Sequence, residues 1–157
     1  MNKAAQTTAL DIQVGGAHYK TMRIQPVQFS LYNNLNAAQH SILKYLVRNK
    51  ASDDLRKAAH FADLWNEIDT LQPGIECACL CRRNDLRLPM ISIEVFVAAN
   101  AIPAAVAEIM ALFLETPSRE RVAMAREKIA ALEQQRFDNE IATSNAKPNQ
   151  PKGKSCN

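Results

Sequence analysis

The chain has 157 residues, 47% of them hydrophobic, which is enough for the core of one ordinary domain or two very small ones. No apolar run approaches the roughly 18 residues of a membrane-spanning helix, and the N-terminus lacks a basic-then-apolar export signal, so we expect a cytoplasmic protein without a membrane partner. The net charge of +3 equals that of Lys147, Lys152 and Lys154 in the C-terminal segment, so the body is neutral, which argues against a broad nucleic-acid interface.

The N-terminal part of the sequence leads into a short helix. Residues 1–13 are polar and lack periodicity, which predicts a disordered arm. A loop then opens at Gly15-Gly16 and contains His18, Tyr19 and Lys20. Pro26 suits the first turn of a helix over about 26–33, where its missing N–H costs no hydrogen bond.

Two longer amphipathic helices follow and are expected to form a hairpin. Asn36 is the expected N-cap of a helix over about 37–50, whose apolar positions fall at 3–4 spacing: Ala38, Ile42, Tyr45 and Leu46. Ser52 or Asp53 caps a second helix that continues to about Leu71. Its expected inward residues are Leu55, Ala58, Phe61, Ala62 and Trp65.

The segment 73–90 is a connector that contains three closely spaced cysteines. A small hairpin over 75–88 and an irregular loop both fit its pattern. Zinc prefers four ligands and usually CxxC pairs, whereas Cys77, Cys79 and Cys81 alternate and would share one side of an extended segment. We therefore expect apolar packing of reduced thiols, with no metal and no cofactor.

Three more helices are expected over about 92–100, 103–115 and 118–139, with Pro103 and Pro117 near two of the starts. Residues 143–157 contain Pro, Asn and Lys and predict a disordered basic tail. The sequence thus predicts an all-α protein with a first helical unit at 14–72 and a second at 91–142.

The two expected units correspond to each other at an offset of 67 residues. Seven identities fall in an ungapped alignment of 23–65 with 90–132, at Ile24, Phe29, Asn33, Ala37, Ala38, Ile42 and Ala58 of the first segment. Cationic residues of the first unit are replaced in the second by Ala111, Glu115, Met124 and Glu127. We interpret the pattern as an internal tandem repeat, a pseudo-dimer in which the second unit serves as scaffold.

The charged residues of the first hairpin form the candidate site. Lys44 and Arg48 share one helical face, and Lys57 and His60 share another, so a closed hairpin could bring them together beside Tyr45 and Phe61. Such a cluster suits a phosphate-bearing anion, and His18, Tyr19 and Lys20 are the loop residues expected to join it. The structural alternative is a solvated face paired with Asp53 and Asp54, a core role for Tyr45, Phe61 and Tyr19, and a helix-capping role for His18.

The same residues resemble a bacteriophage family of unknown function, the SaV-like proteins, over about residues 15–70. The matching positions are His18-Tyr19, Ile24-Gln25-Pro26, Lys44-Tyr45, Arg48, Lys50, Asp54-Leu55, Lys57-Ala58 and His60-Phe61. The chain departs from the family pattern in its shortened turn at residues 51–53. The resemblance implies a phage or prophage origin and brings no established activity.

No complete catalytic motif is present in the sequence. A GxxxxGK[ST] phosphate loop is missing, Asp63, Glu67 and Asp69 lack a facing acidic pair for magnesium, and His40 has no Cys or Ser at motif spacing. We therefore expect a non-catalytic phage accessory protein that binds a host protein or a phosphate-bearing ligand through the first hairpin. The alternatives are a nucleotide-binding or nucleotide-hydrolysing enzyme and a weak nucleic-acid binder; association of identical chains is left open.

Overall fold

The computed structural model describes residues 19–48, 50, 52–71 and 90–145, and every regular element among them is a helix, which confirms the all-α class. The helices are α1 (Pro26–Tyr32), α2 (Ala37–Arg48), α3 (Ser52–Leu71), α4 (Ile93–Asn100), α5 (Ala104–Leu114) and α6 (Arg119–Asn145). None of these helices combines the length and the apolar character that crossing a bilayer requires.

Capping residues set the helix starts where the sequence predicts them. Pro26 occupies the first turn of α1, as expected. At α2, Gln39 donates its backbone N–H to Asn36 Oδ1 at 2.8 Å, and Asn36 donates its own to Gln39 Oε1 at 3.0 Å. This reciprocal pair is a capping box, which satisfies two N–H groups that a helix start leaves unpaired.

Two predicted helix ends need correction. α2 ends at Arg48 rather than near residue 50, and α6 continues to Asn145, so residues 143–145 of the expected disordered tail are helical. The hydroxyl of Thr143 donates to the carbonyls of Asn139 and Glu140, and no Gly or Pro interrupts α6 before its end. The expected arm at 1–13 and the connector with its three cysteines lie outside the described residues.

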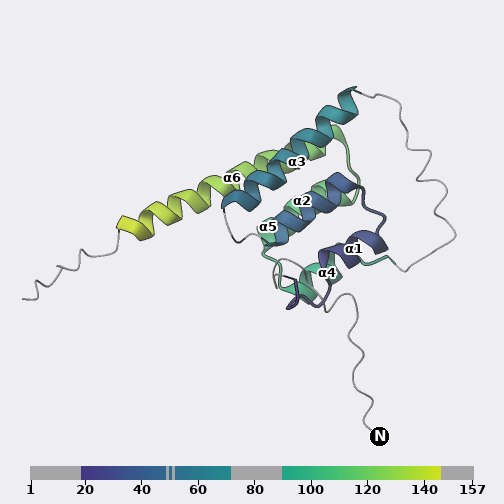
Figure 1. Cartoon of the computed structure of the whole chain (residues 1–157), viewed down its shortest axis with the longest axis horizontal. Coiled ribbons are helices and arrows are strands. Elements are labelled where there is room, and N and C mark those ends of the chain that lie inside the picture. Colours follow the sequence, from purple (N-terminus) through teal and green to yellow (C-terminus); the bar gives the residue numbers. More distant parts are fainter. Residues whose placement is uncertain (1–18, 49, 51, 72–89, 146–157) are drawn as a thin grey trace, which may run out of the picture.

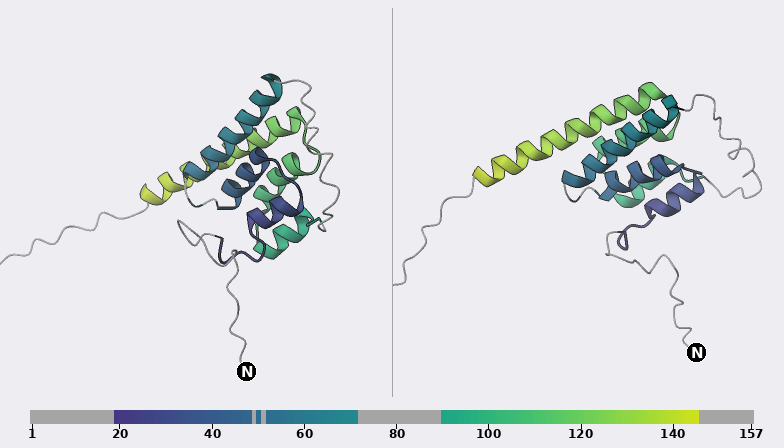
Figure 2. Two further views of the ribbon diagram at one scale, coloured as in Figure 1. Left: turned by 45° about the vertical axis from the view of Figure 1, so that its right-hand side comes forward. Right: turned by 45° about the horizontal axis from the view of Figure 1, so that its top comes forward.

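The helices stack as three pairs, with α3 beside α6, α2 beside α5 and α1 beside α4 (Figure 1). The further views in Figure 2 show the same three pairs. α3 and α6 run antiparallel, because Arg56 pairs with Glu133 at 3.4 Å and Asp63 pairs with Arg126 at 3.1 Å. The C-terminal end of α6 projects beyond the rest of the bundle (Figure 1).

The core lies between these pairs and draws on all six helices. Its apolar members are Phe29, Ile42, Leu43, Leu46, Leu55, Ala58, Ala59, Ala62, Phe96, Val106, Ile109, Met110, Phe113, Val122, Ala125 and Ile129. The rings of Phe29 and Phe96 meet at a centroid distance of 4.5 Å and join α1 to α4. A buried hydrogen bond of 3.0 Å from Gln39 Nε2 to the carbonyl of Phe113 joins α2 to α5.

Candidate anion-binding site

Three cationic side chains of the first hairpin gather around the ring of Tyr45. Lys44 Nζ lies 4.6 Å from the ring centroid, Arg48 Cζ lies 5.2 Å from it, and Lys57 Nζ lies 5.9 Å from it. Lys44 and Arg48 come from α2 and Lys57 from α3, so the hairpin fold brings them together. We call Lys44, Arg48 and Lys57 the basic cluster.

Aromatic packing holds the two helices together beneath the basic cluster. The rings of Tyr45 and Phe61 are stacked at 6.0 Å with an interplanar angle of 20°. His60 meets the edge of Phe61 at 5.9 Å and is itself exposed. His60 therefore lies next to the cluster through Phe61, whereas the three cations contact the Tyr45 ring directly.

The guanidinium of Arg48 is held in place by the carboxylate of Asp54, which the solvated-face alternative counts, with Asp53, as an exposed partner. Asp54 is only 1% exposed, and its Oδ1 accepts from Nε and Nη2 of Arg48, the first at 2.9 Å. Its Oδ2 accepts the backbone N–H of Lys50 at 3.0 Å. The hydrogen bond to Asp54 is the main cause that raises the pKa of Arg48, so the guanidinium is held both in charge and in orientation.

The two lysines of the cluster differ in whether a carboxylate lies beside them. Lys57 Nζ lies 3.4 Å from Asp53, and both side chains are exposed, which agrees with the solvated-face alternative. Lys44 has no carboxylate partner among the residues that the structure describes. Three cations thus face two carboxylates, and the cluster keeps a positive charge.

The N-terminal loop is attached to the same hairpin. Tyr19 donates its hydroxyl to the carbonyl of Lys44 at 3.3 Å, and burial raises the pKa of Tyr19 while Arg48 opposes the shift. This contact joins the loop to α2, and Tyr19 is partly buried rather than a member of the core. Lys20 is exposed, and His18 lies outside the described residues.

His40 has a serine partner that the sequence analysis missed. His40 Nδ1 and Ser30 Oγ share a hydrogen bond of 2.8 Å between α2 and α1. Burial lowers the pKa of His40, and the nearby charge of Lys44 adds to the effect. Ser30 is 7% exposed, so the pair stabilises the helix packing and does not present a nucleophile. The two residues lie on different helices, and no local motif marks them.

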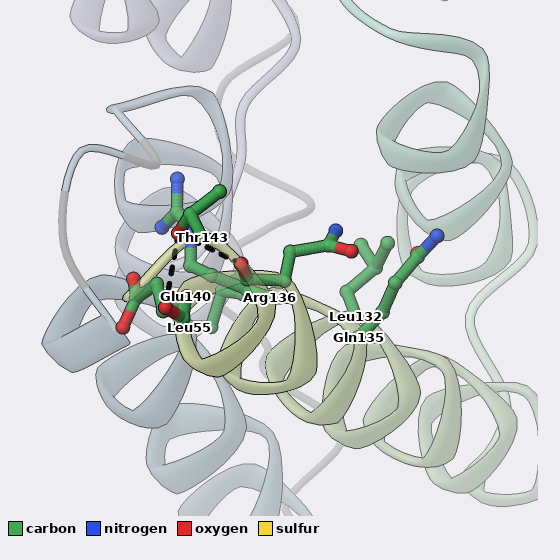
Figure 3. A pocket seen from close by; sticks show the side chains of 7 residues that line it. Leu55, Leu132, Gln135, Arg136, Glu140 and Thr143 are labelled. Carbon is green, nitrogen blue, oxygen red and sulfur yellow. Dashed lines mark hydrogen bonds between the residues drawn. The ribbon is translucent and has the colours of Figure 1, made fainter. Parts of the chain in front are cut away.

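A separate depression of about 510 Å³ lies between the start of α3 and the C-terminal half of α6 (Figure 3). Leu55 and Leu132 supply its apolar part, and Gln135, Arg136, Asn139, Glu140 and Thr143 line the rest. None of the candidate residues from the sequence analysis lines it. No group of three or more His, Cys, Asp or Glu side chains within the described ranges could hold a metal ion.

Comparison with known proteins gives no relative from which a role could be transferred. No protein-family model matches the chain, no curated protein matches it, and no solved structure matches it.

Proposed function

We propose that this chain is a non-catalytic binding protein whose basic cluster takes a phosphate group carried by a host factor or by a small ligand. The observation that carries the proposal is the convergence of Lys44, Arg48 and Lys57 within 6 Å of one aromatic ring. The phage resemblance of the same hairpin supports a host component as the carrier of the phosphate.

Electrostatics favours an anion at this position. The three cationic groups around the Tyr45 ring repel one another, and a bound anion would relieve this repulsion. The carboxylates of Asp53 and Asp54 offset part of this repulsion. A phosphate monoester carries about −1.5 to −2 charges at neutral pH and offers three acceptor oxygens, so it would offset the rest.

The three cations have different roles in the proposed complex. Lys44 Nζ and Lys57 Nζ bind the phosphate oxygens as mobile point charges, whereas Arg48 contributes N–H groups already oriented by Asp54. The side chain of Arg48 is 25% exposed, so part of its guanidinium is accessible.

The surrounding polar groups favour binding over catalysis. Tyr19 donates to a backbone carbonyl, Asp54 is committed to Arg48 and Lys50, and Ser30 is buried against His40. Tyr19, Asp54 and Ser30, each of which could act as acid, base or nucleophile, are therefore used by the fold. Turnover of a nucleotide panel with magnesium tests the enzymatic alternative directly.

Thermal unfolding with phosphate, pyrophosphate and nucleoside monophosphates tests the proposal. A ligand at about 100 times its Kd stabilises the folded state by about 2.7 kcal/mol, which raises the melting temperature. Lys44→Ala with Lys57→Ala should abolish the rise without exposing Asp54, because Arg48 stays in place.

The matched control is Arg126→Ala with Lys128→Ala, which removes two exposed cations from α6. The control should keep the ligand-dependent rise. If wild type shows no rise, or if the control loses as much as the cluster variant, the basic cluster is not an anion site.

A further inference from the structure

Helices of the two halves begin at a constant spacing. α4, α5 and α6 start 67 residues after α1, α2 and α3, at residues 93, 104 and 119 against 26, 37 and 52. A residue with a left-handed backbone follows each short helix at equivalent positions, Asn34 with φ 52° after α1 and Ala101 with φ 51° after α4. This conformation is uncommon for alanine, so its recurrence at Ala101 is informative.

Backbone hydrogen bonds repeat at the same spacing. Leu35 N–H donates to the carbonyl of Ser30 at 3.0 Å, and Ile102 N–H donates to that of Val97 at 3.1 Å. Both bonds close the turn that follows the short helix. The two halves therefore share the shape of this turn as well as the order of their helices.

Buried positions repeat as well. Each of the eight buried apolar residues of the second half lies 67 positions after a buried residue of the first half. The pairs are Phe29 and Phe96, Gln39 and Val106, Ile42 and Ile109, Leu43 and Met110, Leu46 and Phe113, Leu55 and Val122, Ala58 and Ala125, and Ala62 and Ile129. The halves thus bury the same faces of their helices.

Contacts between the halves join equivalent elements. α3 packs on α6 and α2 packs on α5, and the ring of Phe29 meets that of its counterpart Phe96 at 4.5 Å. The paired helices α3 and α6 run antiparallel, as their ion pairs require. Contact between a surface and its own counterpart characterises a twofold-symmetric dimer.

Polarity is reversed at the position of the basic cluster. The Arg48–Asp54 ion pair has its counterpart in Glu115–Arg121, where Arg121 Nη2 lies 3.8 Å from Glu115 Oε2. Arg121 also donates to the carbonyl of Ala111 at 2.7 Å. That carbonyl is the counterpart of the Lys44 carbonyl, which accepts from Tyr19 in the first half.

We propose that the chain is a fused dimer of one three-helix unit, with a pseudo-twofold axis between the halves and a single anion site. In the second unit the site has become a charge-reversed ion pair that closes the end of α5. The partner surface of the first unit is thereby occupied by the second unit. The statement about the anion site rests on the proposed function, whereas the duplication does not.

Exchange of core residues tests the duplication without any ligand. Leu46→Phe with Phe113→Leu swaps residues between equivalent, fully buried positions, so the melting temperature should stay within about 5 °C of wild type. Leu43→Phe with Phe113→Leu makes the same change in composition between non-equivalent positions and should lower the melting temperature by at least about 5 °C more. Equal losses in the two variants would overturn the duplication.

Introducing the residues of the first-unit anion site into the second unit tests whether the second unit has lost such a site. The variant Ala111→Lys, Glu115→Arg, Arg121→Asp and Met124→Lys should bind two phosphates in isothermal titration, where wild type binds one. If both proteins bind one phosphate, the second unit does not contain a lost anion site. If wild type binds none, the proposed function is rejected. The duplication would then still be decided by the exchange of Leu46 and Phe113.

A variant with two substitutions keeps the test valid if the fourfold variant does not fold. Ala111→Lys with Met124→Lys leaves the Glu115–Arg121 pair in place. It should take up more phosphate than wild type at the same free concentration. Equal uptake by the folded variant would contradict the vacated site.

Discussion

The first three helices and the last three place an ion pair at corresponding points and give it opposite polarity. In α2 and α3 the acid is the inner member, because the side chain of Asp54 is 2% exposed and that of Arg48 is 25% exposed. In the second half Glu115 directly follows α5 and Arg121 lies in α6, and both are accessible, with Arg121 at 34% and Glu115 at 52%. Helix packing at these two positions is therefore compatible with either order of acid and base. We infer that the fold does not require the excess of cations on the first hairpin.

The largest expected effect concerns the contact that the two halves share. Phe29→Ala and Phe96→Ala should each lower the free energy of unfolding by about 3–5 kcal/mol, because each ring is buried and leaves a cavity. The double variant should lose less than the sum, since the two rings contact each other. Urea unfolding measures these values.

Phe137→Ala is the matched control for these substitutions. Phe137 is 56% exposed, so its truncation should change stability far less. A loss of under about 1 kcal/mol for Phe96→Ala would mean that the α1–α4 contact does not support the core.

The two ion pairs should differ in their contribution to stability. Asp54→Ala should cost about 3 kcal/mol, because it leaves the Arg48 guanidinium and the Lys50 N–H without their buried acceptor. Glu115→Ala removes an exposed partner and should cost less than about 1 kcal/mol. Chemical unfolding of both variants gives the comparison, and equal costs would contradict the difference in burial.

A smaller effect should appear as a pH dependence confined to the first half. Burial lowers the pKa of His40 below its ordinary value of 6.5, so the unfolded chain binds this proton more readily than the folded one. The contribution of His40 to stability is thus complete above about pH 6.5 and is lost as the pH falls toward the lower pKa of the folded state.

His40→Gln provides the reference for this measurement. Melting temperatures of wild type and variant between pH 7.5 and 5.5 should converge as the pH falls, because only wild type loses this contribution. A constant difference across the range would show that His40 is not the group responsible.

Local rules explain why much of the fold follows from the sequence. Pro26 and the Asn36–Gln39 box fix two helix starts through groups at most three residues away. The sequence predicts too early an end for α6, near residue 139, because the composition after residue 142 indicates disorder although no Gly or Pro comes before Asn145. A helix end inferred from composition alone is a weaker prediction than a helix start set by a capping residue, because no side chain marks the end.

Contacts between distant residues set the limit of prediction at the site. Helical spacing placed Lys44, Arg48 and Lys57 on facing helices, and in the structure they surround Tyr45. The burial of Asp54 and the Ser30–His40 hydrogen bond depend on how whole helices pack, which no local pattern specifies. The sequence indicates which charged residues share a helical face. It does not indicate which of them, such as Asp54, are buried and paired in the folded protein.

A phosphate titration followed by ¹H–¹⁵N NMR tests the central claim most directly, because it compares both halves in one spectrum. The account predicts saturable shifts of the backbone amides of residues 44–48 and 57–61, with little change at their counterparts 111–115 and 124–128. Absence of saturable shifts at the first hairpin, or equal shifts at both sets of positions, would contradict an anion site that only the first half retains.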